Sequence, residues 1–298
     1  MVKETSEKIS YTYSFKVNRS DSLLTFLLNK LSLSRNSVKA LLHDRKVLVN
    51  GNVISQFDYP LAKDDEVKIA KNPVKRNNIV QVNNSFKKLI IYEDEYFLAI
   101  NKPSGMLSVQ SDKDRNSAYS LAIDYLSQKN KKARVYALHR IDKDTSGVLL
   151  FCKDIKLHSK LKTHWNEDIK EREYIAVVNG RIEPDKDRIV SYLNENRNNM
   201  VYVAKQGKKA ITNYETIKAN KNYSLLRVKI ETGRKNQIRV QLADRGFSIV
   251  GDNKYGDGLS PFNRLGLHAS TLSFINPVDH KLITIKASIP AEFNKLFK

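Results

Sequence analysis

The segment HRIDKDTSGVLLF, residues 139–151, places a loop with two cations and two carboxylates directly before an apolar run. Thr145, Ser146 and Gly147 supply the turn residues that a change from polar loop to buried strand requires. A carboxylate in such a loop can be an ion-paired strand end, the commoner case in an arbitrary protein, or a side chain positioned for chemistry. Partners elsewhere in the chain decide between these interpretations.

Two later segments offer such partners. ETGRKNQIRVQLAD, residues 231–244, follows a strand-like run and predicts an amphipathic helix with Arg239 near its first turn. A guanidinium and the positive end of a helix could both orient a carboxylate there. REYIAVVNG, residues 172–180, places Tyr174 at the start of another strand, where its ring could stack on a base. Taken alone, Arg239 would more often be a surface cation and Tyr174 a half-buried strand aromatic.

The chain from about residue 86 alternates strand-like runs with helical candidates. The strand-like runs are KKLIIY (87–92), YFLAIN (96–101), SGVLLFC (146–152), EYIAVVNG (173–180), AITNYETI (210–217) and SLLRVKIE (224–231), and the helical candidates cover 118–129 and 237–244. Several consecutive strands lie close enough to pair as hairpins. The pattern therefore predicts an α+β fold with a mixed, largely antiparallel sheet and flanking helices. A doubly wound parallel sheet fits the pattern less well.

A smaller unit precedes this region, at residues 15–70. Leucines recur on one helical face, Ser34 can cap a second helix, and Asn50-Gly51 marks a hairpin. Arg35 and Lys39 would lie on the polar side, where they could meet phosphates. The unit resembles the small α/β RNA-binding domain first seen in a ribosomal small-subunit protein, and the plainer interpretation is a solvated basic face. Residues 71–85 are interpreted as a linker.

The charge balance indicates a polyanionic partner. The 298 residues carry 52 Lys and Arg against 32 Asp and Glu, a formal net charge of +20, and this attracts nucleic acid or anionic membrane. No apolar run approaches the roughly 20 residues of a spanning helix, and the N-terminus lacks the apolar core of a secretion signal. The single cysteine, Cys152, excludes an intrachain disulfide. We therefore expect a cytoplasmic protein with no membrane partner.

Motifs for cofactors are missing from the sequence. The six histidines show no zinc-ligand spacing, and there is neither a Walker-type GK[ST] loop nor a GxGxxG stretch. We therefore expect no metal and no nucleotide cofactor. The chain also lacks heptads, so we expect a monomer.

Several ordered motifs resemble one family. Besides HRIDKDTSG, the tyrosine-bearing strand and TGRKNQIR, the chain contains NKPSGMLSV (101–109), VGDNKYG (250–256) and RLGLHASTLSF (264–274). In this order they resemble the pseudouridine synthases of the RluA type over residues 86–298, and the small module is a common companion of that family. The resemblance implies the pseudouridine synthase fold and an isomerase that converts specific uridines of RNA to pseudouridine without a cofactor. It favours large-subunit ribosomal RNA over transfer RNA as the substrate.

The resemblance also implies roles for single side chains. Asp142 is the expected catalytic carboxylate, Tyr174 contacts the target base, and Arg239 pairs with Asp142. An ionised carboxylate can stabilise or trap the positive charge that develops on the sugar when the bond from ribose to base breaks. The uridine must leave its stack to reach it. The residues expected to contact RNA are Arg140, Lys102, Arg234, Lys235 and Asn236, with Arg35 and Lys39 of the small module.

Two residues depart from the family pattern. Asn236 stands where histidine is usual, which puts a substrate contact in doubt more than the reaction, because amides and imidazoles both form hydrogen bonds. Ile141 replaces leucine and nearly conserves volume.

Two other functions compete with catalysis of this isomerisation. The first is a non-catalytic RNA-binding or ribosome-assembly factor on the same fold, which the joint presence of Asp142, Tyr174 and Arg239 disfavours. The second is a nuclease. It would need a metal-ligating carboxylate cluster or a histidine pair that acts as acid and base, and the sequence indicates neither.

Overall fold

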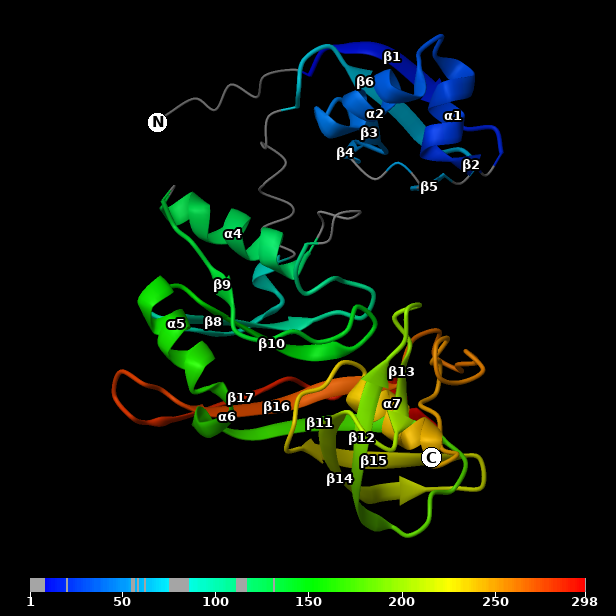
Figure 1. The fold of residues 1–298 in the computed structure, drawn as a ribbon. Coiled ribbons are helices and arrows are strands. Elements are labelled where there is room, and N and C mark those ends of the chain that lie inside the picture. The colour runs from blue at the N-terminus through cyan, green and yellow to red at the C-terminus, as the bar shows by residue number, and fades with distance from the viewer. Residues whose placement is uncertain are drawn as a thin grey trace. The chain divides into compact units, whose positions relative to one another are not determined.

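The computed structural model describes residues 9–19, 21–54, 57, 59–61, 63–74, 86–110, 117–130 and 132–297. Contacts divide the chain into unit 1, Met1–Val82, and unit 2, Asn83–Lys298, and each is described by itself (Figure 1). Most of the segment interpreted as a linker, residues 75–85, lies outside the described residues.

Unit 1 combines two short helices with a small sheet. Its elements are β1 (Tyr11–Lys16), β2 (Asp21–Ser22), α1 (Leu23–Lys30), α2 (Arg35–His43), β3 (Val47–Val49), β4 (Asn52–Val53), β5 (Pro60–Leu61) and β6 (Glu66–Ala70). Four strands pair in the order β1-β6-β3-β4, and β2 pairs with β5. Ser34 caps α2 by accepting the backbone N–H of Ser37, and Asn50 has the positive φ, 49°, that the hairpin turn requires. β1 escapes prediction because most of its side chains are exposed.

Unit 2 is built on one large sheet. Its elements are β7 (Ile90–Glu93), β8 (Phe97–Lys102), α4 (Ala118–Lys129), β9 (Tyr136–Ala137), β10 (Ser146–Cys152), α5 (Ile155–Thr163), α6 (Trp165–Asp168), β11 (Ile169–Asn179), β12 (Lys186–Glu195), β13 (Val201–Ala204), β14 (Lys208–Ala219), β15 (Tyr223–Ile230), α7 (Gln237–Asp244), β16 (Leu267–Ile275), β17 (Leu282–Lys286) and α8 (Ala291–Lys295). The strand order is β13-β12-β14-β15-β11-β16-β10-β8-β7, with β17 on β16 and β9 on β10.

The sheet of unit 2 is mixed but largely antiparallel. Among the named strands of the described residues, β10 and β16 form the one parallel pair, and the other pairs are antiparallel. Helices flank this sheet (Figure 1). The predicted α+β fold is therefore confirmed.

Strand β10 is buried along its whole length because helices cover both of its faces. Val148 and Leu150 pack in the cluster that contains residues of α5, and Leu149 and Phe151 pack in the cluster that contains residues of α4. This explains why SGVLLFC is a continuous apolar run rather than an alternating one. A strand held in this way fixes the end of the loop that precedes it.

Gly147 is required where β10 begins. Its φ is +112°, and an added Cβ would lie 2.1 Å from the backbone oxygen of Ala269 in β16. At the same point Ser146 Oγ lies 2.8 Å from Nδ1 of the buried His268. The turn residues of TSG thus join the charged loop closely to β16.

Candidate active site

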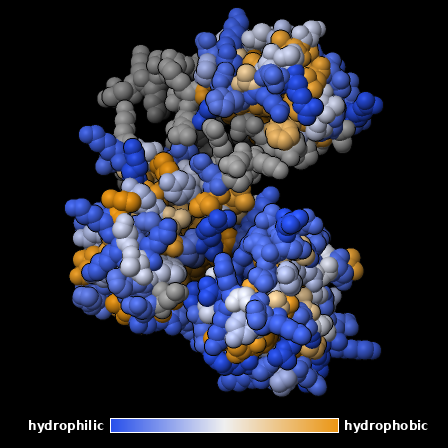
Figure 2. Space-filling view, viewed as in Figure 1, coloured by the Kyte–Doolittle hydropathy of each residue, from blue (hydrophilic) through white to orange (hydrophobic). Residues whose placement is uncertain are grey.

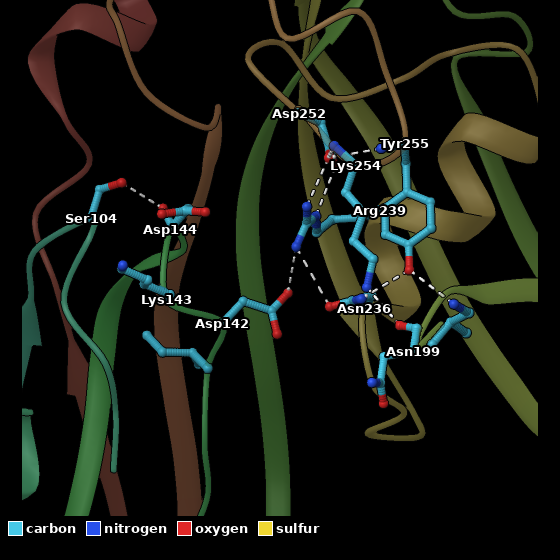
Figure 3. Close-up of polar contacts among 12 residues, drawn as sticks. Ser104, Asp142, Lys143, Asp144, Asn199, Asn236, Arg239, Asp252, Lys254 and Tyr255 are labelled. Carbon is cyan, nitrogen blue, oxygen red and sulfur yellow. Dashed lines mark hydrogen bonds and ion pairs between the residues drawn. The ribbon is translucent and has the colours of Figure 1, made fainter. Parts of the chain in front are cut away.

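Asp142 and Arg239 meet although 97 residues separate them. Asp142 lies in the loop between β9 and β10, and α7 presents Arg239 to it, so that Nη1 of Arg239 donates to Oδ2 of Asp142 at 3.2 Å. The Asp142 side chain is 33% exposed, whereas that of Arg239 is 10% exposed. The carboxylate can therefore meet a ligand while the guanidinium supports it from behind (Figure 3).

Arg239 is itself held by a second carboxylate. Its Nε and Nη2 donate to the two oxygens of Asp252, each at 2.7 Å, and the Asp252 side chain has no exposed surface. Burial alone would lower the pKa of Arg239, but the hydrogen bonds and charges of Asp252 and Asp142 outweigh it and raise that pKa. Burial would likewise raise the pKa of Asp252, and Arg239 outweighs it and lowers that pKa. Both groups are charged, and the bidentate pair fixes the guanidinium plane.

Asn236, expected to contact RNA, is turned toward Asp142. It is the N-cap residue of α7 with φ 53° and ψ 20°. The amide orientation that satisfies both of its ends places Nδ2 2.9 Å from Oδ2 and 3.3 Å from Oδ1 of Asp142, with its oxygen 2.9 Å from the Tyr255 hydroxyl. Figure 3 shows the Asn236 amide between these two side chains in the opposite orientation, in which its oxygen accepts from Nη1 of Arg239 at 3.5 Å and its nitrogen lies 2.9 Å from the Tyr255 hydroxyl.

Tyr174 lies half-buried in β11, beside the same loop. Burial raises the pKa of Tyr174 to about 12, opposed by Arg172 and assisted by the charge of Asp142. The hydroxyl is therefore protonated at neutral pH. At this position the tyrosine offers an uncharged aromatic ring.

Lys102, also expected among the RNA contacts, is fully buried. Its Nζ donates to the backbone oxygens of Pro103, Met106 and Lys143, at 3.0, 2.7 and 2.9 Å. A direct contact between this ammonium and RNA does not fit such burial. Lys102 instead ties the NKPSG segment to the residue that follows Asp142.

The stability of the protein should depend on pH through Lys102. Burial lowers the pKa of Lys102 from 10.5 to about 7, opposed by Asp144 and then Asp142. Between these values the unfolded chain binds more protons, so stability rises with pH across that window. Lys102→Met removes this term. The measured quantity is the difference in free energy of unfolding, parent minus Lys102→Met. We expect this difference to rise with pH, by up to about 1.4 kcal/mol per pH unit between about pH 7 and 10.

Urea unfolding at several pH values measures this difference. The matched control is Lys143→Met in the same loop, which removes an exposed lysine and therefore tests whether the burial of Lys102 causes the effect. A difference for Lys102→Met that stays constant with pH would contradict the prediction.

The remaining candidates lie at the surface. Arg140 is exposed in the loop of Asp142, and Arg234 and Lys235 are exposed just before α7. Nε of Arg234 donates to the backbone oxygen of Lys209 at 3.0 Å, and Lys235 forms an ion pair with Glu195. Arg35 and Lys39 are exposed on α2 of unit 1.

The described residues carry neither a metal cluster nor a membrane span. No three His, Cys, Asp or Glu side chains among them gather into a group that could bind a metal ion. No helix within these same ranges is both long and apolar enough to cross a membrane. Figure 2 shows hydrophilic residues over most of the visible face of unit 2 and apolar ones in small patches.

Asp252 and Tyr255 complete the site but are not singled out from the sequence. Both lie in the quoted segment VGDNKYG. The available signal is indirect: a buried arginine needs a carboxylate partner, and this segment supplies one. Periodicity gives no such information for an irregular loop.

Solved structures define the class of protein to which this fold belongs. The structure titled Human RNA Pseudouridylate Synthase Domain Containing 4 matches with a TM-score of 0.59 and 20% identity, over 72% of this chain and 94% of that chain. The fold of unit 2 is thus that of the pseudouridylate synthases.

Sequence relatives identify the family. The family model described as RNA pseudouridylate synthase matches residues 96–244, which include Asp142, Tyr174 and Arg239. Ribosomal large subunit pseudouridine synthase D of Zymomonas mobilis subsp. mobilis is 34% identical, over 70% of this chain and 71% of its own length. The large-subunit synthase C of Buchnera aphidicola subsp. Baizongia pistaciae is 30% identical over 97% and 96%, and tRNA pseudouridine synthase C of Vibrio parahaemolyticus is 32% identical over 70% and 93%.

The chain therefore belongs to the RNA pseudouridylate synthase family and is an RNA pseudouridine synthase. This confirms the resemblance to the RluA-type enzymes.

Proposed function

We propose that this enzyme isomerises specific uridines of large-subunit ribosomal RNA, with Asp142 as the catalytic carboxylate and the uridine flipped out of its stack. The observation that carries the proposal is the partly exposed Asp142 carboxylate, supported by an Arg239 guanidinium that Asp252 clamps from the other side.

The reaction needs a carboxylate of this kind. When the bond between ribose C1′ and uracil N1 breaks, positive charge develops at C1′, and Asp142 stabilises that charge or forms a bond to C1′. The detached uracil turns and C5 bonds to C1′, and where Asp142 had bonded to C1′ that bond breaks and the carboxylate is released. The proton on C5 then leaves, and N1 gains a proton. Atoms and charge balance without an oxidant, a reductant or a group donor. Arg239 aims the carboxylate through its hydrogen bond to Oδ2.

Tyr174 holds the uracil during this rotation. An aromatic ring stacks on any base face with about 1–3 kcal/mol, and stacking allows the base to turn in its own plane. The raised pKa of the Tyr174 hydroxyl keeps the ring neutral beside Asp142. A phenolate there would repel the carboxylate.

Phosphate contacts offset the cost of flipping. Extruding a base costs a few kcal/mol, and cations that neutralise phosphates supply comparable free energy. Arg140, Arg234 and Lys235 are accessible in or near the site and serve this purpose, with the net charge of +20 behind them.

The small module, residues 15–70, adds a second RNA contact ahead of the catalytic domain, residues 86–298. Arg35 and Lys39 are four positions apart on α2 and therefore share one helical face. Both are exposed, and Lys39 Nζ lies 5.5 Å from the ring centroid of Phe57. A cationic face of this kind suits a phosphate backbone.

The extent of the matches to relatives supports ribosomal RNA as the substrate. The relative that matches 97% of this chain is named as a large-subunit ribosomal enzyme, whereas the relative named as a tRNA enzyme matches 70% of it. A match along nearly the whole chain includes the small module as well as the catalytic residues. This favours a shared class of RNA.

Label release tests the proposal directly. Purified protein is incubated with uridine-labelled transcripts that carry tritium on C5, either large-subunit ribosomal RNA or a pool of transfer RNAs. We expect release from the ribosomal transcript at a stoichiometry of whole uridines and none from the transfer RNA pool. Release from transfer RNA alone would overturn the substrate assignment, and release from neither RNA would overturn the proposed reaction on these substrates.

A further inference from the structure

Asp142 has two supports of different chemical kinds. Arg239 reaches one oxygen, Oδ2, with a charged donor at 3.2 Å. The Asn236 amide reaches both oxygens, at 2.9 and 3.3 Å, with a neutral donor. We propose that Asn236 is a positioning residue that sets the rotation of the Asp142 carboxylate, and that Tyr255 holds Asn236 in the orientation this requires. The inference rests on the proposed catalytic role of Asp142.

The orientation of Asn236 is determined from several sides. Its backbone is fixed in the left-handed region at the start of α7, a conformation that asparagine adopts more readily than most residues. Its amide oxygen accepts the Tyr255 hydroxyl at 2.9 Å. The same hydroxyl accepts the backbone N–H of Val201, at the start of β13, at 3.1 Å. One hydroxyl proton and one lone pair are thus both used, and the amide nitrogen is left to face Asp142.

Arg239 also holds the tyrosine in place. The Arg239 guanidinium lies 5.3 Å from the centroid of the Tyr255 ring, and Lys254 Nζ lies 5.4 Å from it, distances at which cations are attracted to an aromatic ring. Backbone N–H groups of Lys254 and Tyr255 donate to Asp252 at 2.9 and 3.0 Å. One loop therefore fixes both of the side chains that support Asp142.

A neutral donor suits a carboxylate that must react. Each cation beside a carboxylate keeps it ionised but also lowers its nucleophilicity. An amide restrains rotation of the carboxylate without adding charge. The sequence position next to Asn236 carries Lys235, but its ammonium pairs with Glu195, so Arg239 is the cation that donates to Asp142.

Steady-state kinetics separate positioning from binding of RNA. For Asn236→Ala we expect kcat to fall on the order of 10-fold to 100-fold, because small displacements of reacting groups cost rates of that size, with KM for RNA within about 2-fold. Tyr255→Phe should lower kcat in the same direction by less. A raised KM with unchanged kcat would instead show Asn236 to be an RNA contact and would overturn the proposal.

A pH profile adds a test that a purely structural role would not pass. In Asn236→Asp the introduced carboxyl faces Asp142, Arg239 and Tyr255, with Asp252 and Lys254 behind them. While protonated it can donate to Asp142 as the amide does; once ionised it loses the donor and places two anions together. Asp142, 2.9 Å from the side-chain atom that faces it, raises the pKa of the introduced carboxyl, and the more distant Arg239 guanidinium opposes this rise. We expect kcat to fall with rising pH between about pH 5 and 8, a limb absent from the parent enzyme.

The matched control is Asn222→Asp, the same change at an exposed position in the turn between β14 and β15, which should keep the parent profile. If kcat of Asn236→Asp depends on pH in the same way as kcat of the parent, the inference is overturned. Asp142→Asn separates the two levels of the proposal. If that variant is active, the proposed catalysis fails and this inference with it; if it is inactive while Asn236→Ala keeps the parent kcat, only this inference fails.

Discussion

Replacement of Asp142 by Asn is expected to lower kcat for pseudouridine formation by at least about 10⁴-fold, the scale of loss when a central catalytic group is removed. At 1.36 kcal/mol per tenfold, this corresponds to about 5.4 kcal/mol of transition-state stabilisation. The amide has nearly the shape of the carboxylate and can still accept from Arg239, so binding of RNA should persist. Single-turnover tritium release with saturating enzyme measures the chemical step, and a filter-binding titration measures affinity.

Asp144→Asn is the matched control for this experiment. It makes the same change two residues further along the same loop, where the side chain is exposed, and should leave kcat within about 2-fold of the parent, as expected of a surface position. If Asp142→Asn retained more than a few per cent of the parent rate while Asp144→Asn lost it, the catalytic carboxylate would have been assigned to the wrong residue.

Asp252→Asn is expected to damage both stability and rate. Asp252 is fully buried and accepts two hydrogen bonds from Arg239 at 2.7 Å. Removing one partner of a buried ion pair leaves an uncompensated charge and costs about 3–5 kcal/mol. The guanidinium also loses the clamp that aims it at Asp142, so kcat should fall by about 100-fold or more. Urea unfolding and tritium release on the same preparation measure the two effects.

Asp257→Asn serves as the control for Asp252→Asn. Asp257 lies in the same loop, and its exposed carboxylate accepts the backbone N–H of Leu259 at 2.9 Å. A loss of no more than about 1 kcal/mol is expected there. Equal losses of stability in the two variants would mean that the Arg239–Asp252 ion pair stabilises the fold no more than a surface hydrogen bond does. An Asp252→Asn variant with the parent kcat would mean that the hydrogen bonds from Arg239 to Asp252 do not affect catalysis.

Regular elements with clear apolar patterns could be predicted from the sequence. Helices α4 and α7 have the predicted bounds, and β8, β10 and β15 coincide with apolar runs. Strand β12 is harder to predict because its burial alternates with many exposed positions, and β13 has only four residues. Pairing order could not be predicted, because the insertion of β16 between β10 and β11 depends on contacts between residues that lie 91 to 122 positions apart.

Those site residues that lie in recognisable sequence motifs could be predicted. The expected meeting of Asp142 and Arg239 is found at 3.2 Å. Residue type alone could not indicate that Lys102 is buried, because lysine is rarely buried and three backbone oxygens from separate positions are needed to hold it. Asn236 was expected to contact RNA, and the sequence did not indicate its left-handed backbone at the start of α7 or its position beside Asp142.

The position of β16 in the sheet also determines when the site can exist. This strand lies between β10, which follows Asp142, and β11, which carries Tyr174, yet it is made after every residue of the site, at Leu267–Ile275. A nascent chain emerging from the ribosome therefore holds Asp142, Tyr174 and Arg239 before it has the strand that joins β10 to β11. Contacts this distant in sequence form slowly. We therefore expect chains that end before β16, although rich in cations for RNA, to be inactive.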